Sequence, residues 1–100
     1  GLYGLTYKEN VDDMRESPTL QLLEVLKEEN INDVKVYDPM IKERKIDNQV
    51  MNIDEFLNEV DIVVVLVAHD EIKNNQALLN NKIIYDTRNI INLEGRVYRL

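Results

Sequence analysis

The chain has 100 residues, of which 44% are hydrophobic, 31% charged and 6% aromatic. This is enough apolar material for one compact domain and too little length for two. The chain has no cysteine, which excludes a disulfide framework, a thiolate zinc site and a cysteine nucleophile in these residues and fits a cytoplasmic location. Its net charge of −7, from 19 acids against 12 bases, would repel a nucleic-acid backbone. No apolar run approaches the ~20 residues that span a bilayer, so we expect neither a nucleic acid nor a membrane as partner.

The first half of the chain predicts strands and one clear helix. We expect a strand over residues 1–7, then a helix that Ser17 caps and Pro18 opens, because the missing N–H of proline is harmless at the first helical position. The helix has an apolar stripe formed by Leu22, Leu23, Val25 and Leu26. Asn30 is a suitable stop. Two further strands are expected over 34–37 and, shorter, around 49–51.

The second half is dominated by residues 62–68, which are seven consecutive apolar residues. A continuous run, rather than an alternating one, is typical of a strand covered on both faces, so we expect it at the centre of a sheet. Before it, Asn52 or Asp54 can cap a short helix with the apolar residues Phe56, Leu57 and Val60. After it, Asp70 can cap a helix through Ile72, Ala77, Leu78 and Leu79.

Strands over 82–85 and, as an alternating edge strand, over 96–100 complete the pattern. The alternation of strands and helices predicts an α/β fold with right-handed crossovers. We expect a three-layer Rossmann-like domain with a mainly parallel sheet in the order 3-2-1-4-5-6.

The phosphate-binding motifs of such folds are absent. A dinucleotide fingerprint needs G-x-G-x-x-G between the first strand and its helix, so that the pyrophosphate can approach the helix N-terminus. The only glycines are Gly1, Gly4 and Gly95, and G-x-x-x-x-G-K-[ST] is missing too. A Rossmann-like domain with this sequence has no self-sufficient dinucleotide site.

A long charged loop separates the first strand from its helix. Long loops at the carboxyl edge of a sheet are where such folds keep their sites. Composition alone favours turn and capping roles for Asp12 and Asp13 and solvated positions for Lys8, Arg15 and Glu16. A ligand site in this loop is the alternative.

Several polar residues follow expected strands. Asp12 and Asp13 with Asp38, Asp86 and Thr87 suggest a receiver-type magnesium pocket, but the paired acids lie several residues beyond their strand and no lysine closes the last strand end.

Two residues at strand ends have structural interpretations. Asp38 precedes Pro39 and is therefore read as a turn residue. His69 is the only histidine and follows the central strand, where no serine or cysteine partner is identifiable. A structural role is therefore favoured over that of a general base, and no catalytic or metal-ligating set is expected.

Residues 4–18, G-L-T-Y-K-E-N-V-D-D-M-R-E-S-P, closely resemble the opening of the C-terminal domain of the UDP-glucose/GDP-mannose dehydrogenase family. Residues 37–39 (Y-D-P), 68–70 (A-H-D) and 86–89 (D-T-R-N) agree in order, so the resemblance runs through almost the whole chain. The R-E-S-P and D-T-R segments are most similar to the UDP-N-acetylhexosamine branch. Because Gly1 opens inside an apolar segment, we expect residues 1–100 to be the C-terminal UDP-sugar-binding domain of a longer chain.

The resemblance implies a domain that closes over a nucleotide sugar beside an N-terminal NAD-binding domain of the same chain. Members oxidise the sugar C6 alcohol to a carboxylate by two hydride transfers to NAD, using a cysteine outside this domain. For the intact protein it implies UDP-N-acetyl-D-mannosamine as substrate and a homo-oligomer. The 100 residues alone are expected to be inactive.

The resemblance also assigns roles to residues. Tyr7 and Lys8 match the family's contact to the UDP part of the substrate, Arg88 matches an arginine that joins them, and Arg15 matches one that reaches toward NAD. An ammonium and a bidentate guanidinium suit a nucleotide diphosphate. We expect Lys8 and Arg88 to share the carboxyl edge of the sheet, roughly 10 Å apart, with the strand over 62–68 between them.

Two alternatives remain at this point. One is a UDP-glucose 6-dehydrogenase domain, which differs only in the sugar oxidised by the whole protein. The other is a non-catalytic nucleotide-binding or receiver-like module, which nucleotide binding without catalysis, or Mg²⁺ binding at Asp12 and Asp13, would favour.

Overall fold

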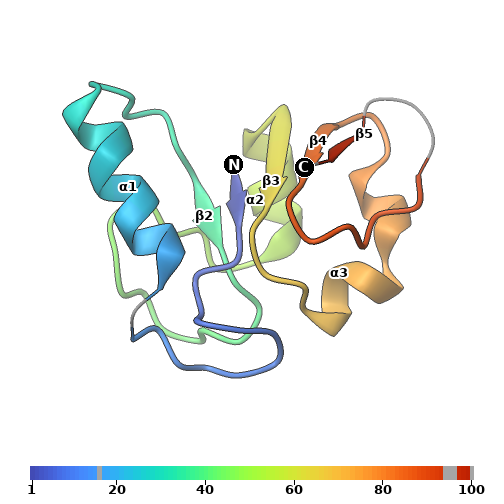
Figure 1. Cartoon of the computed structure of the whole chain (residues 1–100), viewed down its shortest axis with the longest axis horizontal. Helices are drawn as coiled ribbons and strands as arrows, with labels where there is room; N and C mark the ends of the chain where they lie inside the picture. The colour runs from blue at the N-terminus through green and yellow to red at the C-terminus, as the bar shows by residue number, and fades with distance from the viewer. Residues whose placement is uncertain (16, 94–96, 100) are drawn as a thin grey trace.

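The computed structural model describes residues 1–15, 17–93 and 97–99. Its centre is a five-stranded, fully parallel sheet in the order β2-β1-β3-β4-β5 (Figure 1). The strands are β1 (Leu2–Tyr3), β2 (Val36–Tyr37), β3 (Ile62–Val65), β4 (Ile83–Asp86) and β5 (Val97–Arg99). The helices are α1 (Pro18–Glu28), α2 (Ile53–Glu59), α3 (Asp70–Asn74) and the 3-10 helix η1 (Gln76–Leu79).

The expected third strand is the main difference from the predicted order 3-2-1-4-5-6. Around residues 49–51 the chain forms only an isolated parallel bridge between Gln49 and Val36 on the outer side of β2. The Gln49 side chain is tied back to the preceding loop at Lys45 and Glu43, and α2 begins at Ile53. Too few residues lie between this bridge and α2 to form a strand. The other five strands follow the predicted order.

The expected strand over 1–7 is also shorter than predicted. It ends after Tyr3 because Gly4 has a φ of 114°, which turns the chain out of the sheet. A Cβ at Gly4 would lie 2.6 to 2.8 Å from atoms of Val67, so the position requires glycine for both its conformation and its close contact.

Helix α1 begins at Pro18 as predicted, and Ser17 occupies the N-cap position. The prediction of a Ser17 cap is wrong, because its side chain makes no capping hydrogen bond and its buried hydroxyl has no partner among the described residues. It ends at Glu28, and Asn30 has the left-handed φ of 60° that stops it. The prediction of a buried Val25 is wrong, because this side chain is 53% exposed. The sheet instead receives the leucine side of the helix, which comprises Leu20, Leu22, Leu23 and Leu26.

Helix α2 confirms Asn52 as its cap, since the Asn52 side chain accepts from the backbone N–H of Glu55 at 2.8 Å. The prediction that Asp70 caps the helix after β3 is wrong, because His69 occupies the N-cap position and Asp70 is the first helical residue. The helix stops at Asn74 and is followed by η1. The Asn75 side chain donates to the carbonyl of Glu71 at the break. Of the predicted apolar positions here, Ile72 and Leu79 are buried and Ala77 and Leu78 are exposed.

Two apolar clusters lie on opposite faces of the sheet, because successive strand residues point to opposite sides. One contains Val63 and Val65 with residues of α2, α3 and η1, and the other contains Leu2 and Val36 with the leucines of α1. The predicted three-layer α/β architecture is confirmed, with α1 at the β2 end of the sheet and α3 at the β4 end (Figure 1). Among the described residues, no helix has the length and apolar character needed to cross a bilayer.

Candidate functional site

The carboxyl ends of the strands form one edge of the sheet, since all described strands are parallel. The loop after β1, coloured blue, and the connection from β3 into α3 both lie below the sheet in Figure 1. Lys8 follows β1 and Arg88 follows β4, and β3 separates these two strands. Both cationic residues are exposed, so the topology brings two cations to one edge of an acidic chain.

Arg88 is held over the end of β3. Its Nε donates to the carbonyl oxygen of Leu66, the residue after β3, at 2.9 Å. Leu66 in turn donates its backbone N–H to the carbonyl of Tyr3 in β1. The guanidinium therefore reaches from β4 across β3 toward β1, and it forms no ion pair with an acid in the described part of the chain.

Asp86 organises the loop that presents Arg88. One carboxylate oxygen accepts the backbone N–H of Arg88 at 3.0 Å, and the other accepts those of Ile90 and Ile91, each at 2.8 Å. Asp86 is 1% exposed. Its role is to fix the loop after β4, and both of its oxygens are occupied.

The loop after β1 closes on itself. The backbone N–H of Tyr7 donates to the carbonyl of Asp13 at 2.7 Å, and the Thr6 hydroxyl donates to the carbonyl of Lys8 at 3.0 Å. The Tyr7 side chain is 51% exposed. The structure thus places Tyr7 and Lys8 together at the edge, with no ion pair on Lys8 among the residues described.

Arg15 lies farther along the loop in a bidentate pair with Asp13. Its Nε and Nη2 donate to the two carboxylate oxygens at 3.1 and 2.9 Å, and its backbone N–H adds a third bond. These hydrogen bonds from Arg15 hold the pKa of Asp13 at about 2 and raise the pKa of Arg15. The Arg15 side chain is 88% exposed. Glu16 lies outside the described residues.

Asp38 has a larger structural role than the turn role that the sequence predicted. It has the expected turn bond, from the backbone N–H of Met40, but its second oxygen also accepts from Leu5, Thr6 and His69. It is 2% exposed. Burial alone would raise its pKa, but the hydrogen bonds from His69 and from the backbone outweigh burial and lower it.

His69 completes this buried cluster. Its Nε2 lies 2.9 Å from the Asp38 carboxylate and 3.2 Å from the Thr6 hydroxyl, and its Nδ1 accepts the backbone N–H of Asn10 at 2.9 Å. Thr6 and Asn10 were not singled out from the sequence. The sequence features that could have indicated this cluster are a lone histidine and an Asp-Pro pair, each at the end of a strand.

The geometry of the buried acids does not favour the magnesium alternative. Mg²⁺ needs free oxygen ligands, whereas both carboxylate oxygens of Asp38 and of Asp86 already accept hydrogen bonds from N–H donors. Within the ranges that the structure describes, no three His, Asp or Glu side chains are grouped as a metal site. Neither of these two buried acids is therefore available as a ligand of a receiver-like magnesium site.

Among the described residues, the turn after β1 offers no free backbone cradle for a dinucleotide. The turn after β1 is held by Asp38 through the N–H groups of Leu5 and Thr6, and these N–H groups are therefore not free to bind a pyrophosphate. The Arg15 side chain in the same loop is exposed.

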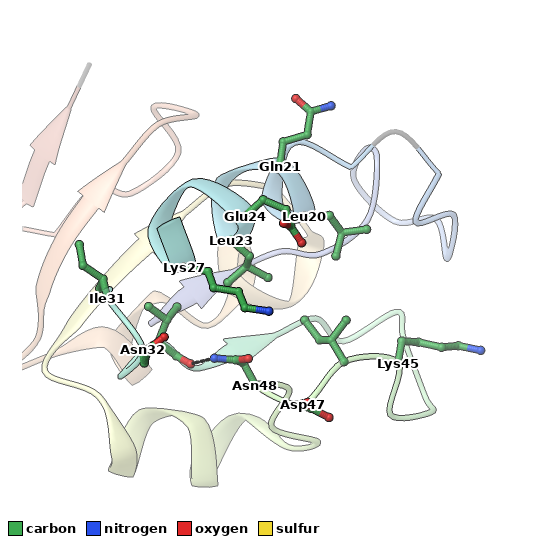
Figure 2. Close-up of a pocket in the computed structure, with 12 residues that line it drawn as sticks. Leu20, Gln21, Leu23, Glu24, Lys27, Ile31, Asn32, Lys45, Asp47 and Asn48 are labelled. Atoms are coloured by element: carbon green, nitrogen blue, oxygen red, sulfur yellow. Dashed lines mark hydrogen bonds between the residues drawn. The ribbon is translucent and has the colours of Figure 1, made fainter. Parts of the chain in front are cut away.

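A groove of about 800 Å³ lies away from these residues, between α1 and residues 45–48 (Figure 2). Its apolar side chains are Leu20, Leu23, Ile31, Val34 and Ile46. The Asn48 side chain donates to the carbonyl of Val34 inside it. None of the four residues carried over from the resemblance lines this groove.

Comparisons with known proteins agree on one family. Residues 1–93 match the UDP-glucose/GDP-mannose dehydrogenase family, UDP binding domain. A UDP-N-acetyl-D-mannosamine dehydrogenase of Methanocaldococcus jannaschii is 41% identical over 93% of this chain and 23% of its own length. An NDP-N-acetyl-D-galactosaminuronic acid dehydrogenase of Ralstonia nicotianae is 32% identical over 86% of this chain and 21% of its own.

A solved structure agrees as well. The UDP-N-acetyl-mannosamine dehydrogenase of Staphylococcus aureus superposes with a TM-score of 0.77 and 30% identity, over 98% of this chain and 25% of that one. The chain thus spans about a fifth to a quarter of the length of the proteins that it matches.

Proposed function

The chain belongs to the UDP-glucose/GDP-mannose dehydrogenase family as a UDP binding domain, and on this premise we propose that residues 1–100 hold the UDP part of a nucleotide sugar at the carboxyl edge of the sheet. In the intact protein this domain would work with an N-terminal NAD-binding domain as an NAD-dependent UDP-sugar 6-dehydrogenase. The proposed substrate is UDP-N-acetyl-D-mannosamine, because relatives that are 41% and 30% identical to this chain are named as dehydrogenases of that sugar nucleotide.

One observation carries the proposal. In a chain with a net charge of −7, Lys8 and Arg88 lie exposed at the same edge, on strands separated by β3, and neither has an acidic partner among the described residues. Open α/β sheets bind ligands at this edge, at the point where the strand order reverses. Here that point lies between β1 and β3. An anionic ligand would supply the negative charge that pairs with these two cations.

Each residue has a distinct part in this binding. Arg88 is anchored through Nε to Leu66, so its terminal nitrogens can donate to two oxygens of one phosphate. Lys8 provides a compact charge on a flexible stem. Tyr7 is half-exposed beside it and offers an aromatic ring to the nucleoside.

The hydride transfers would take place outside these 100 residues. NAD, bound mainly by the N-terminal domain, would accept the hydrides, and Arg15 would reach toward it from the loop. The contribution of these 100 residues is to bind and orient the UDP-sugar. The UDP-glucose alternative is decided by turnover of the full-length enzyme with each sugar.

Isothermal titration of the 100-residue chain with UDP tests the binding proposal. We expect UDP to bind, Lys8→Ala to weaken it about tenfold, and Arg88→Lys to weaken it despite the retained charge, because the planar fork is lost. Lys27→Ala is the matched control, since Lys27 is an exposed lysine in the last turn of α1. Equal affinities for the unaltered chain and the Lys8→Ala and Arg88→Lys variants would refute the assignment.

A further inference from the structure

The loop that carries Lys8 is fastened to the rest of the domain at Asn10. The backbone N–H of Asn10 donates to His69 Nδ1 at 2.9 Å, and its side-chain oxygen accepts the backbone N–H of Asp70 at 3.0 Å. These contacts join residues about 60 positions apart. Asn10 also has a φ of 59°, so the loop reverses direction at this fastening.

The bond to Asp70 also caps the first backbone N–H of helix α3. His69 occupies the N-cap position but its side chain makes no capping bond. The orphan N–H groups of a helix start need an acceptor, and Asn10 supplies one from the distant loop. The loop and the start of α3 therefore form one unit.

His69 is itself fixed from the other side. Because Nδ1 accepts a hydrogen bond, the proton of the neutral ring must be on Nε2, which faces the Asp38 carboxylate at 2.9 Å and the Thr6 hydroxyl at 3.2 Å. His69 is 1% exposed and Asp38 is 2% exposed. The ring cannot rotate without losing bonds at both nitrogens.

We propose that His69, oriented by Asp38, is a positioning residue that holds the loop over residues 7–13 so that Lys8 faces the UDP diphosphate. This inference rests on the proposed function, since it assigns a role in binding the same ligand. The connection is short: Thr6 contacts His69 and donates to the carbonyl of Lys8, while Asn10 contacts His69 two residues beyond Lys8. Lys8 thus lies between two attachments to one imidazole.

The test uses His69→Phe in the 100-residue chain. Phenylalanine keeps a ring beside Tyr3, whose centroid lies 6.0 Å from that of His69, and removes both nitrogens. Amide hydrogen exchange by NMR would be measured for the loop over 7–13 and for β3, together with the UDP dissociation constant. We expect exchange at Asn10 to accelerate at least tenfold with β3 unchanged, and UDP to bind about tenfold more weakly.

A double-mutant cycle with Lys8→Ala separates positioning from general destabilisation. If His69 acts through Lys8, then His69→Phe adds little loss of affinity once Lys8 is alanine. Fully additive effects on UDP binding, or unchanged exchange at Asn10, would overturn the inference.

Asn10→Gly is the second variant, in case His69→Phe exposes the core and β3 also exchanges rapidly. Glycine accepts the left-handed conformation, and this change removes the side-chain bond to Asp70 while it keeps the backbone N–H that donates to His69. We expect faster loop exchange and weaker UDP binding, and no change in either would overturn the inference. Failure of the unaltered chain to bind UDP would refute the proposed function, whereas the exchange rates without ligand judge the fastening separately.

Discussion

Replacing Asp38 with asparagine should destabilise the domain strongly. The carboxylate accepts three hydrogen bonds from backbone N–H groups and one from His69, all between 2.7 and 3.0 Å. Asparagine has the same shape but only one carbonyl oxygen. Its NH₂ group must face at least one N–H donor, which leaves a buried donor without an acceptor.

The cost follows from this arrangement. One unsatisfied buried donor costs about 1–3 kcal/mol, and the remaining bonds lose the contribution of the charged acceptor. A hydrogen bond to a charged group contributes about 1.5–3 kcal/mol, so the loss of one such bond together with an unsatisfied buried donor leads us to expect a loss of at least about 3 kcal/mol for Asp38→Asn. In a domain of this size each kcal/mol lowers Tm by about 4–8 °C, so Tm should fall by about 12 °C or more.

Urea and thermal unfolding followed by circular dichroism measure this loss. Asp33→Asn is the matched control, because Asp33 is exposed. A decrease in Tm of less than about 3 °C for Asp38→Asn would refute the view that this carboxylate organises the carboxyl edge.

The pH dependence of stability provides a second measurement on the same group. The pKa of Asp38 in the folded chain lies below its ordinary 3.8, so the native state favours the charged form. Its stabilisation is therefore complete well above pH 3.8 and is lost as the pH falls through 3.8 toward the folded value. The difference in stability between the original chain and Asp38→Asn should shrink over that acid range, and a constant difference would contradict the lowered pKa.

Three further outcomes are expected. Gly4→Ala should destabilise the chain by about 2 kcal/mol or more in urea, because its φ is 114° and the new Cβ would lie within 2.8 Å of Val67 atoms; unchanged stability would refute the close approach. In the full-length enzyme, Arg15→Ala should raise the apparent KM for NAD several-fold and leave that for the UDP-sugar nearly unchanged, whereas equal effects would count against a cofactor role. The 100-residue chain should unfold cooperatively on heating yet form no NADH from NAD and UDP-N-acetyl-D-mannosamine, and turnover by it would contradict the division of labour between domains.

Local sequence determined several elements because the physical cause lies within a few residues. The apolar run after Asp61 predicted the central strand, which is β3, although the strand covers only Ile62–Val65 of the run and Ile62 is half-exposed. Pro18 opens α1 at the first helical position, and Asn52 caps α2 through a bond to a residue three positions away. The alternation of these elements was sufficient to predict a parallel α/β sheet.

Tertiary structure decided what depends on residues distant in the chain. Asp38 and His69 are 31 positions apart and Asn10 and His69 are 59 apart, and they meet because parallel strands bring their carboxyl ends to one edge. The same packing left Val25 in solvent and reduced the third strand to a single bridge. Periodicity and propensity report only the immediate neighbours of a residue, whereas a buried carboxylate acquires its role from the donors that the whole sheet assembles around it.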